Sequence, residues 1–158
     1  MSQQSGTLKI VFTDAYFMRM ALQEAERAYE AGEVPVGAVV VSQNRVIARA
    51  HNQVEKLQDA TAHAEMLALT AAFNTLGTKY LPACTLYVTL EPCLMCSSAL
   101  YWAKLARLVF GASDPNRGYR KLGNNSLHPR TEVCTNVLAD ESQKILQDFF
   151  LYLRHLVY

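Results

Sequence analysis

This sequence has few cysteines, no long apolar run and a net charge close to zero. The first two features each exclude a class of protein. The four cysteines among 158 residues are too few and too unevenly spaced for the disulfide framework of a secreted domain. The first residues lack a basic leader followed by an apolar core, and no apolar run reaches the roughly 18 residues of a membrane span. The net charge of +1 does not by itself indicate nucleic acid. We therefore expect a soluble, cytoplasmic protein without a membrane association.

What the chain does contain is typical of one globular domain. Hydrophobic residues make up 51% and charged residues 18% of the sequence, which is too apolar for a disordered tail. A chain of this length buries roughly 70% of its unfolded surface without disulfide or metal staples. The sequence shows neither an internal repeat nor a linker, so we expect a single domain over residues 1–158.

Hydrophobic periodicity predicts helices and strands that alternate along the chain. Helices are expected over residues 13–33, 62–77, 92–104 and 140–156, and strands over residues 36–41, 46–52, 85–90, 106–112 and 131–137. Pro92 is expected at the first helical position, where its missing N–H costs nothing. This order predicts an α/β layer fold with a hairpin first and parallel crossovers later. Trp102 and the thiols of Cys84 and Cys134 are expected in the core, and Phe149 and Phe150 on a packed helix face.

Cys93 and Cys96 lie three residues apart at the start of a predicted helix. Residues with this spacing share one helix face, at about 5–6 Å between their Cβ atoms, so both sulfurs can reach one zinc ion. The positive end of the helix dipole favours the thiolate that a ligand must become. The same C-x-x-C spacing also fits a thiol redox pair or a buried structural pair, and the motif alone leaves all three interpretations open.

His63 and Glu65 stand two residues apart in "TAHAEM", and such residues do not share a face inside a helix. If both serve one site, "HAE" must occupy the start of the helix, before the regular turn is established. His63 alone fits a core or cap residue, and Glu65 alone fits a favourable charge in a first turn. Their combination with the later P-C-x-x-C is what indicates chemistry, because H-x-E followed by P-C-x-x-C is typical of zinc-dependent nucleobase deaminases.

Several longer stretches make the sequence resemble the bacterial tRNA-specific adenosine deaminases of the cytidine deaminase superfamily. The matching stretches are "EVPVGAVVV", "HN" at residues 51–52, "TAHAEM", "TLYVTLEPCLMC", "LVFGASD" and "LADES…DFF". The resemblance implies an α/β fold, a three-layer sandwich of helices around a mixed five-stranded sheet. It also implies a homodimer, and conversion of adenosine to inosine at the wobble position of a tRNA anticodon stem-loop.

The resemblance assigns roles to individual residues. His63, Cys93 and Cys96 would hold Zn²⁺ and leave one tetrahedral position for water. Two thiolates cancel the formal charge of the metal, so a base is needed beside that water, and Glu65 is free to act as one. The residues that match pocket or nucleotide contacts of the family are Val34, Asn52, Ala64 and Asp114.

The sequence departs from the family at two places. The segment "PNRGYRKLGNNSLHPRTEV" differs from the family pattern, so no RNA contact is transferred beyond Asp114. The stretch "SALYWAK" is also similar to free guanine deaminases, which share the zinc signature and therefore form the alternative function.

Between residues 104 and 130, six basic residues stand against one acidic residue. This excess suits either phosphates of a nucleic acid or a solvated loop.

Overall fold

The structure is a computed structural model that describes residues 10–123 and 126–157. Its five strands form one mixed sheet of order β2-β1-β3-β4-β5. The strands are β1 (Gly37–Ser42), β2 (Arg45–His51), β3 (Cys84–Leu90), β4 (Arg107–Ala112) and β5 (Glu132–Cys134). β1 pairs antiparallel with β2 and β3, whereas β3 with β4 and β4 with β5 pair parallel. The predicted hairpin followed by parallel crossovers is therefore confirmed.

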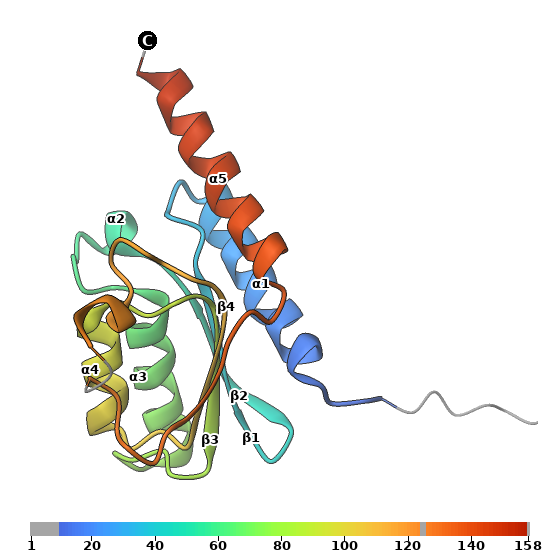
Figure 1. The fold of residues 1–158 in the computed structure, drawn as a ribbon, viewed down its shortest axis with the longest axis vertical. Helices are drawn as coiled ribbons and strands as arrows, with labels where there is room; N and C mark the ends of the chain where they lie inside the picture. Colours follow the sequence, from blue (N-terminus) through green and yellow to red (C-terminus); the bar gives the residue numbers. More distant parts are fainter. Residues whose placement is uncertain (1–9, 124–125, 158) are drawn as a thin grey trace, which may run out of the picture.

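Helices cover both faces of this sheet, as Figure 1 shows. The helices α1 (Asp14–Glu30) and α5 (Ala139–Leu156) lie on one face, and α3 (Ala64–Leu76) and α4 (Leu94–Trp102) on the other. The short helices α2 (Val54–Leu57) and η1 (Tyr119–Leu122) follow β2 and β4 in the chain, and the sequence analysis missed both. The expected three-layer sandwich is confirmed. Within the described ranges, no helix is long and apolar enough to cross a membrane.

The strand period of two divides the core into two layers. Ala38 and Val40 belong to the cluster that packs with α3, whereas Val39 and Val41 belong to the cluster that packs with α1. Because successive side chains point to opposite faces, a strand covered on both sides is apolar throughout. This explains why "GAVVV" shows no alternation between apolar and polar residues.

The ends of the helices are set by local side-chain chemistry. The Tyr16 N–H donates to Oγ1 of Thr13 at 3.1 Å, so Thr13 caps α1. Gly77 ends α3 with a left-handed φ of 63°. The expectation for Pro92 is wrong: α4 begins at Leu94, with Cys93 as its N-cap, and Pro92 lies before the helix.

The expected core residues differ in their outcomes. Cys84 and Phe149 are buried, whereas Cys134 is only half-buried and Phe150 is exposed. The prediction for Trp102 is wrong, because this residue is 75% exposed at the end of α4. Helical periodicity identifies which residues share a face, but it does not identify whether another element covers that face.

Candidate active site

Three side chains from two helices converge at one edge of the sheet. The Nδ1 atom of His63 lies 3.7 Å from Sγ of Cys93 and 3.5 Å from Sγ of Cys96. One ligand atom from each of these residues lies within 4.8 Å of the others. One imidazole nitrogen and two thiol sulfurs at this separation are a donor set that zinc prefers. The three residues therefore fit a zinc ion.

The start of each helix explains why these residues meet. His63 is the N-cap of α3 and Cys93 is the N-cap of α4, and both have extended backbone conformations. Extended geometry at His63, followed by helix from Ala64, lets His63 and Glu65 reach the same site although they are two residues apart. The prediction that "HAE" occupies the start of the helix is confirmed. Because Cys93 is the N-cap of α4, the positive end of this helix dipole lies at its thiol.

The two thiols differ in acidity because they share a hydrogen bond. The bond from the Cys96 thiol, aided by bonds from His63 and from the Cys96 N–H, lowers the pKa of Cys93 to about 4. The same bond, together with burial, raises the pKa of Cys96. The hydrogen bond with Cys93 raises the pKa of His63 above its usual value. Metal binding by both sulfurs thus requires the release of the Cys96 proton.

Glu65 lies beside the cluster without belonging to it. Its side chain comes from the first turn of α3, is 4% exposed, and accepts a hydrogen bond from Sγ of Cys96 at 3.4 Å. Burial raises the pKa of Glu65 above the ordinary carboxyl value. A buried carboxyl whose pKa lies closer to neutrality is suited to accept and return protons.

A cleft of about 930 Å³ opens over this cluster. Six of the eight residues predicted for the site line it, namely Val34, Asn52, His63, Glu65, Cys93 and Asp114. The other two, Ala64 and Cys96, are fully buried behind the wall. Apolar side chains of α5 complete the opposite side of the cleft, among them Leu146, Phe150 and Leu153.

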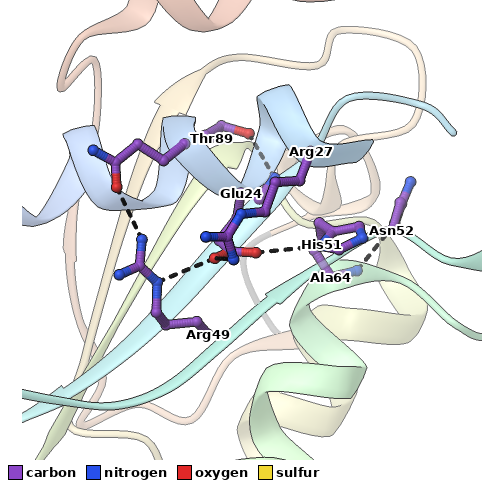
Figure 2. A network of polar contacts seen from close by, with 9 residues as sticks. Glu24, Arg27, Arg49, His51, Asn52, Ala64 and Thr89 are labelled. Atoms are coloured by element: carbon purple, nitrogen blue, oxygen red, sulfur yellow. Dashed lines mark hydrogen bonds and ion pairs between the residues drawn. The ribbon is translucent and has the colours of Figure 1, made fainter. Parts of the chain in front are cut away.

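Two hydrogen bonds fix the orientation of Asn52 at the end of β2. Its backbone N–H donates to the Val36 carbonyl at 3.1 Å. Its Oδ1 accepts from the Ala64 N–H at 3.0 Å, as Figure 2 shows. The amide oxygen is therefore used within the protein, and the NH₂ group is the part of Asn52 left to donate to a ligand. Ala64 thus acts on the cleft through its backbone N–H.

A buried ionic network anchors the strand that carries Asn52. Glu24 of α1, which is 2% exposed, accepts from Nε of Arg49 at 3.1 Å and lies 3.2 Å from Nδ1 of His51 (Figure 2). Arg27 also donates to Glu24. Since a buried carboxylate is costly unless it is paired, three nitrogen partners account for its place in the core.

The sequence analysis missed two buried carboxylates that line the cleft, Glu33 and Glu91. Glu33 accepts from the N–H groups of Glu55 and Lys56 and so caps α2. Glu91 holds Arg120 in an ion pair of 2.7 Å. The position of Glu91 between a buried strand and the C-x-x-C motif was the available signal.

The basic residues between positions 104 and 130 have different structural roles. Arg107 pairs with Asp14, Arg120 pairs with Glu91, and Nζ of Lys104 lies over the Tyr80 ring. Of the six basic residues between positions 104 and 130, only Arg117 is among the residues that line the cleft. Arg107 and Arg120 are thus paired with carboxylates of the chain, and Arg117 is the member of this stretch that lines the cleft.

A His-Cys-Cys cluster with a free carboxylate, on a mixed sheet of this topology, defines the class of zinc-dependent nucleobase deaminases. The sequence signature of the cytidine and deoxycytidylate deaminase zinc-binding region matches residues 12–112. A tRNA-specific adenosine deaminase of Aquifex aeolicus is 46% identical over 89% of this chain and 95% of its own length. The chain therefore belongs to the family of tRNA-specific adenosine deaminases within the cytidine and deoxycytidylate deaminases.

Solved structures agree with this membership. A structure from a study of A-to-I editing by tRNA deaminases at the wobble position of transfer RNA has a TM-score of 0.78 and 43% identity. It aligns with 83% of this chain and 99% of that chain. A guanine deaminase from Nitrosomonas europaea has a TM-score of 0.76 at 25% identity, and the alignment covers 91% of this chain and 88% of that chain. The fold is thus shared by enzymes for both substrates, whereas the sequence is more similar to the tRNA enzymes.

Proposed function

We propose that this protein hydrolytically deaminates adenosine to inosine at the wobble position of a tRNA anticodon, with zinc as its cofactor. The observation that carries the proposal is the His63–Cys93–Cys96 cluster, with Glu65 beside it, at the base of a cleft. Relatives that carry the name tRNA-specific adenosine deaminase, similar over most of the chain, support the choice of substrate.

The proposed roles follow from the positions of the side chains. His63, Cys93 and Cys96 would hold zinc, which when bound supplies Lewis-acid activation of water. Glu65 takes a proton from the attacking water and passes it to the purine nitrogen next to the reacting carbon. It then assists departure of the amino group, so that adenosine and water become inosine and ammonia.

Three further residues would hold the substrate. The NH₂ group of Asn52 donates to an acceptor of the base, because its oxygen is already bonded to Ala64. Val34 forms an apolar part of the wall, and Asp114 stands on the opposite loop. The target nucleotide must leave its neighbours to enter the cleft, which is easiest in an unpaired loop.

The cleft is large enough to admit a nucleotide of an unpaired loop. Its volume of about 930 Å³ lies at the upper end of the roughly 300–1,000 Å³ of pockets for drug-sized ligands. Phe150 lines the same cleft and is 44% exposed, and unpaired bases stack readily on aromatic side chains.

The test is a comparison of two substrates with one enzyme preparation. We expect inosine to form in unmodified tRNA and no xanthine to form from free guanine, with zinc bound at about one ion per chain. Xanthine without inosine would instead establish the guanine deaminase alternative. The variant His63→Ala should lose zinc, whereas a metal-free protein with a cycling Cys93–Cys96 disulfide would establish a redox function.

The same proposal includes a homodimer, and the surface of α4 supports it. Leu94, Tyr101 and Trp102 are large hydrophobic residues that are 47%, 37% and 75% exposed on this helix. Exposed apolar groups of this size typically mark an interaction surface.

We also propose that residues 1–158 act as one domain, since one sheet joins both core layers, and that the protein works in the cytoplasm.

A further inference from the structure

The carboxylate of Glu91 holds the segment of the cleft lining that contains Ser113, Asp114 and Arg117. Glu91 follows β3 directly and is 4% exposed. Its Oε1 accepts from the Asp114 N–H at 3.2 Å, and its Oε2 accepts from the Arg120 N–H at 3.2 Å. The buried Glu91 side chain thus accepts hydrogen bonds from the first and the last residue of the segment 114–120.

The side chain of Arg120, which belongs to the same segment, also donates hydrogen bonds to Glu91. Its Nε and Nη2 both donate to Oε1 of Glu91, at 3.1 and 2.7 Å, and Nη2 also donates to Oγ of Ser113 at 2.8 Å. The guanidinium carbon lies 5.0 Å from the centroid of the buried Phe110 ring. Two of the three guanidinium nitrogens of Arg120, Nε and Nη2, are therefore bonded to Glu91 and Ser113, although the side chain is 39% exposed.

The backbone around Gly118 joins the same segment to the turn that carries Cys93. Gly118 forms an isolated bridge with Cys93, and the Tyr119 N–H donates to the Pro92 carbonyl at 2.9 Å. A Cβ atom on Gly118 would overlap Oε2 of Glu91 and the carbonyl of Asp114. The close approach of Glu91 to the loop thus depends on glycine at position 118.

We propose that Glu91 and Arg120 form a positioning pair that fixes the wall 113–117 against the Cys93 turn and so presents Arg117 and Asp114 to the RNA. Both presented residues line the cleft, and Oδ1 of Asp114 accepts from the Arg117 N–H at 3.0 Å. Arg120 itself binds no phosphate. The inference rests on the proposed function, because it assigns the pair to binding of the tRNA anticodon loop.

The salt dependence of the reaction separates Arg120 from Arg117, which serves as a matched control three positions away. A residue that binds a phosphate of single-stranded nucleic acid contributes about 0.7 to the slope of log affinity against log salt. With an anticodon stem-loop as substrate, Arg117→Met should reduce this slope, measured from KM. Arg120→Met should raise KM roughly tenfold or more and change kcat little, and its slope should fall no further than in Arg117→Met, because Arg120 acts through Arg117. The double variant of Arg117→Met and Arg120→Met should show the slope of Arg117→Met alone. A slope that is lower in the double variant than in Arg117→Met, or an unchanged KM in Arg120→Met, would overturn the proposal.

The variant Arg120→Lys keeps the positive charge but loses the planar fork that grips Glu91 and Ser113. A positioning role predicts that Arg120→Lys resembles Arg120→Met, whereas a phosphate contact predicts that it resembles the wild type. Zinc content measured alongside should stay at the wild-type level in both variants. Loss of zinc would show that the pair serves the metal site and would overturn the assignment to RNA binding.

Amide hydrogen exchange tests the pair without any substrate. The Asp114 and Arg120 N–H groups donate to Glu91, so both should exchange faster in Arg120→Met than in the wild type. The Leu108 amide in β4 is the internal control and should keep its protection. Unchanged exchange at Asp114 would overturn the positioning pair, whatever the substrate proves to be. Faster exchange together with absence of inosine in tRNA would instead retain the pair and refute the proposed function.

Discussion

At the scale of single residues, Glu65 is the side chain whose chemical role can be isolated most cleanly. Glu65 is buried beside the cluster of His63, Cys93 and Cys96 but is not one of its three ligands. It accepts a hydrogen bond from Cys96. The variant Glu65→Gln preserves its shape and removes its ability to accept a proton. We expect retained fold and zinc, with inosine formation slower by about 10²–10⁴-fold or more.

The matched control is Glu55→Gln, because Glu55 is an exposed glutamate that lines the same cleft. Its substitution should change the rate by a small factor, since loss of one negative charge from the rim affects only steering of the RNA. Rates are measured as inosine per zinc ion. A Glu65→Gln enzyme that works at close to the wild-type rate would refute the assignment of Glu65 as the proton carrier.

The residues of the site were predictable to the extent that their chemistry depends on residue type and local spacing. His63, Glu65, Cys93 and Cys96 stand in two short motifs, and the motif fixes which atoms can meet. Glu91 and Arg120 are 29 positions apart, and an ordinary ion pair leaves no mark on the sequence at that separation. The excess of basic residues was visible, but charge alone does not reveal which cations are already paired with a carboxylate.

At the scale of secondary-structure elements, one ion pair fastens α1 to the centre of the sheet. Asp14 in the first turn of α1 accepts from Nη1 and Nη2 of Arg107 at 2.6 and 2.8 Å, and from the Tyr87 hydroxyl at 2.8 Å. The bond from Arg107 is the main cause that lowers the pKa of Asp14. The side chains of Asp14 and Arg107 are 29% and 25% exposed, so solvent screens the pair only in part.

We expect Asp14→Asn to lower the free energy of unfolding by about 1–2 kcal/mol at pH 7. A carboxyl whose pKa is lower in the folded state stabilises the fold above its unfolded pKa of about 3.9, and this contribution is lost as the pH falls through the folded value. The difference between wild type and variant should therefore shrink below about pH 4. Urea unfolding of both proteins at a series of pH values measures it.

The control is Asp148→Asn, which removes the exposed i,i+4 partner of Lys144 on α5. An exposed pair of this kind contributes about 0.3–0.5 kcal/mol, so the free energy of unfolding should change little. A difference between wild type and Asp14→Asn that stays constant from pH 7 to pH 3 would contradict the ion-pair account. The effect would then come from packing of the first turn.

The elements that the sequence predicted are those with a periodic signal over a full turn or strand. The hairpin of β1 and β2 follows from two apolar runs around a polar turn, where Gln43 and Asn44 adopt left-handed φ values of 50° and 59°. The helices α2 and η1 each have four residues, too few for a hydrophobic period to emerge. Their positions are set by tertiary contacts, such as the cap that Glu33 places on α2.

At the scale of the whole molecule, the layer order was predictable and the use of the outer surfaces was not. Alternation of strands and helices restricts the chain to a few layered folds, and the observed sandwich is one of them. The sequence of α4 is apolar on most sides, with "LMCSSALYW" between the cysteine turn and Ala103. The sequence of such a helix predicts a core position in both cases, whether its second apolar face packs within the chain or against a second chain. The sequence alone therefore does not reveal that Trp102 is exposed within one chain.

The exposed end of α4 leads to a prediction about assembly. In the proposed homodimer, Trp102 is buried against the second chain, where a large aromatic side chain contributes strongly to binding. We expect wild-type protein at micromolar concentration to sediment with twice the mass of the 17.7 kDa chain. Trp102→Lys should shift the protein to monomer without unfolding it, because the side chain is 75% exposed within one chain. Leu151→Lys, a like substitution at a 49% exposed site on α5 in the opposite layer, should leave the dimer intact. A Trp102→Lys protein that remains dimeric would remove α4 from the interface, because a buried lysine opposite an apolar surface costs more than such a contact contributes.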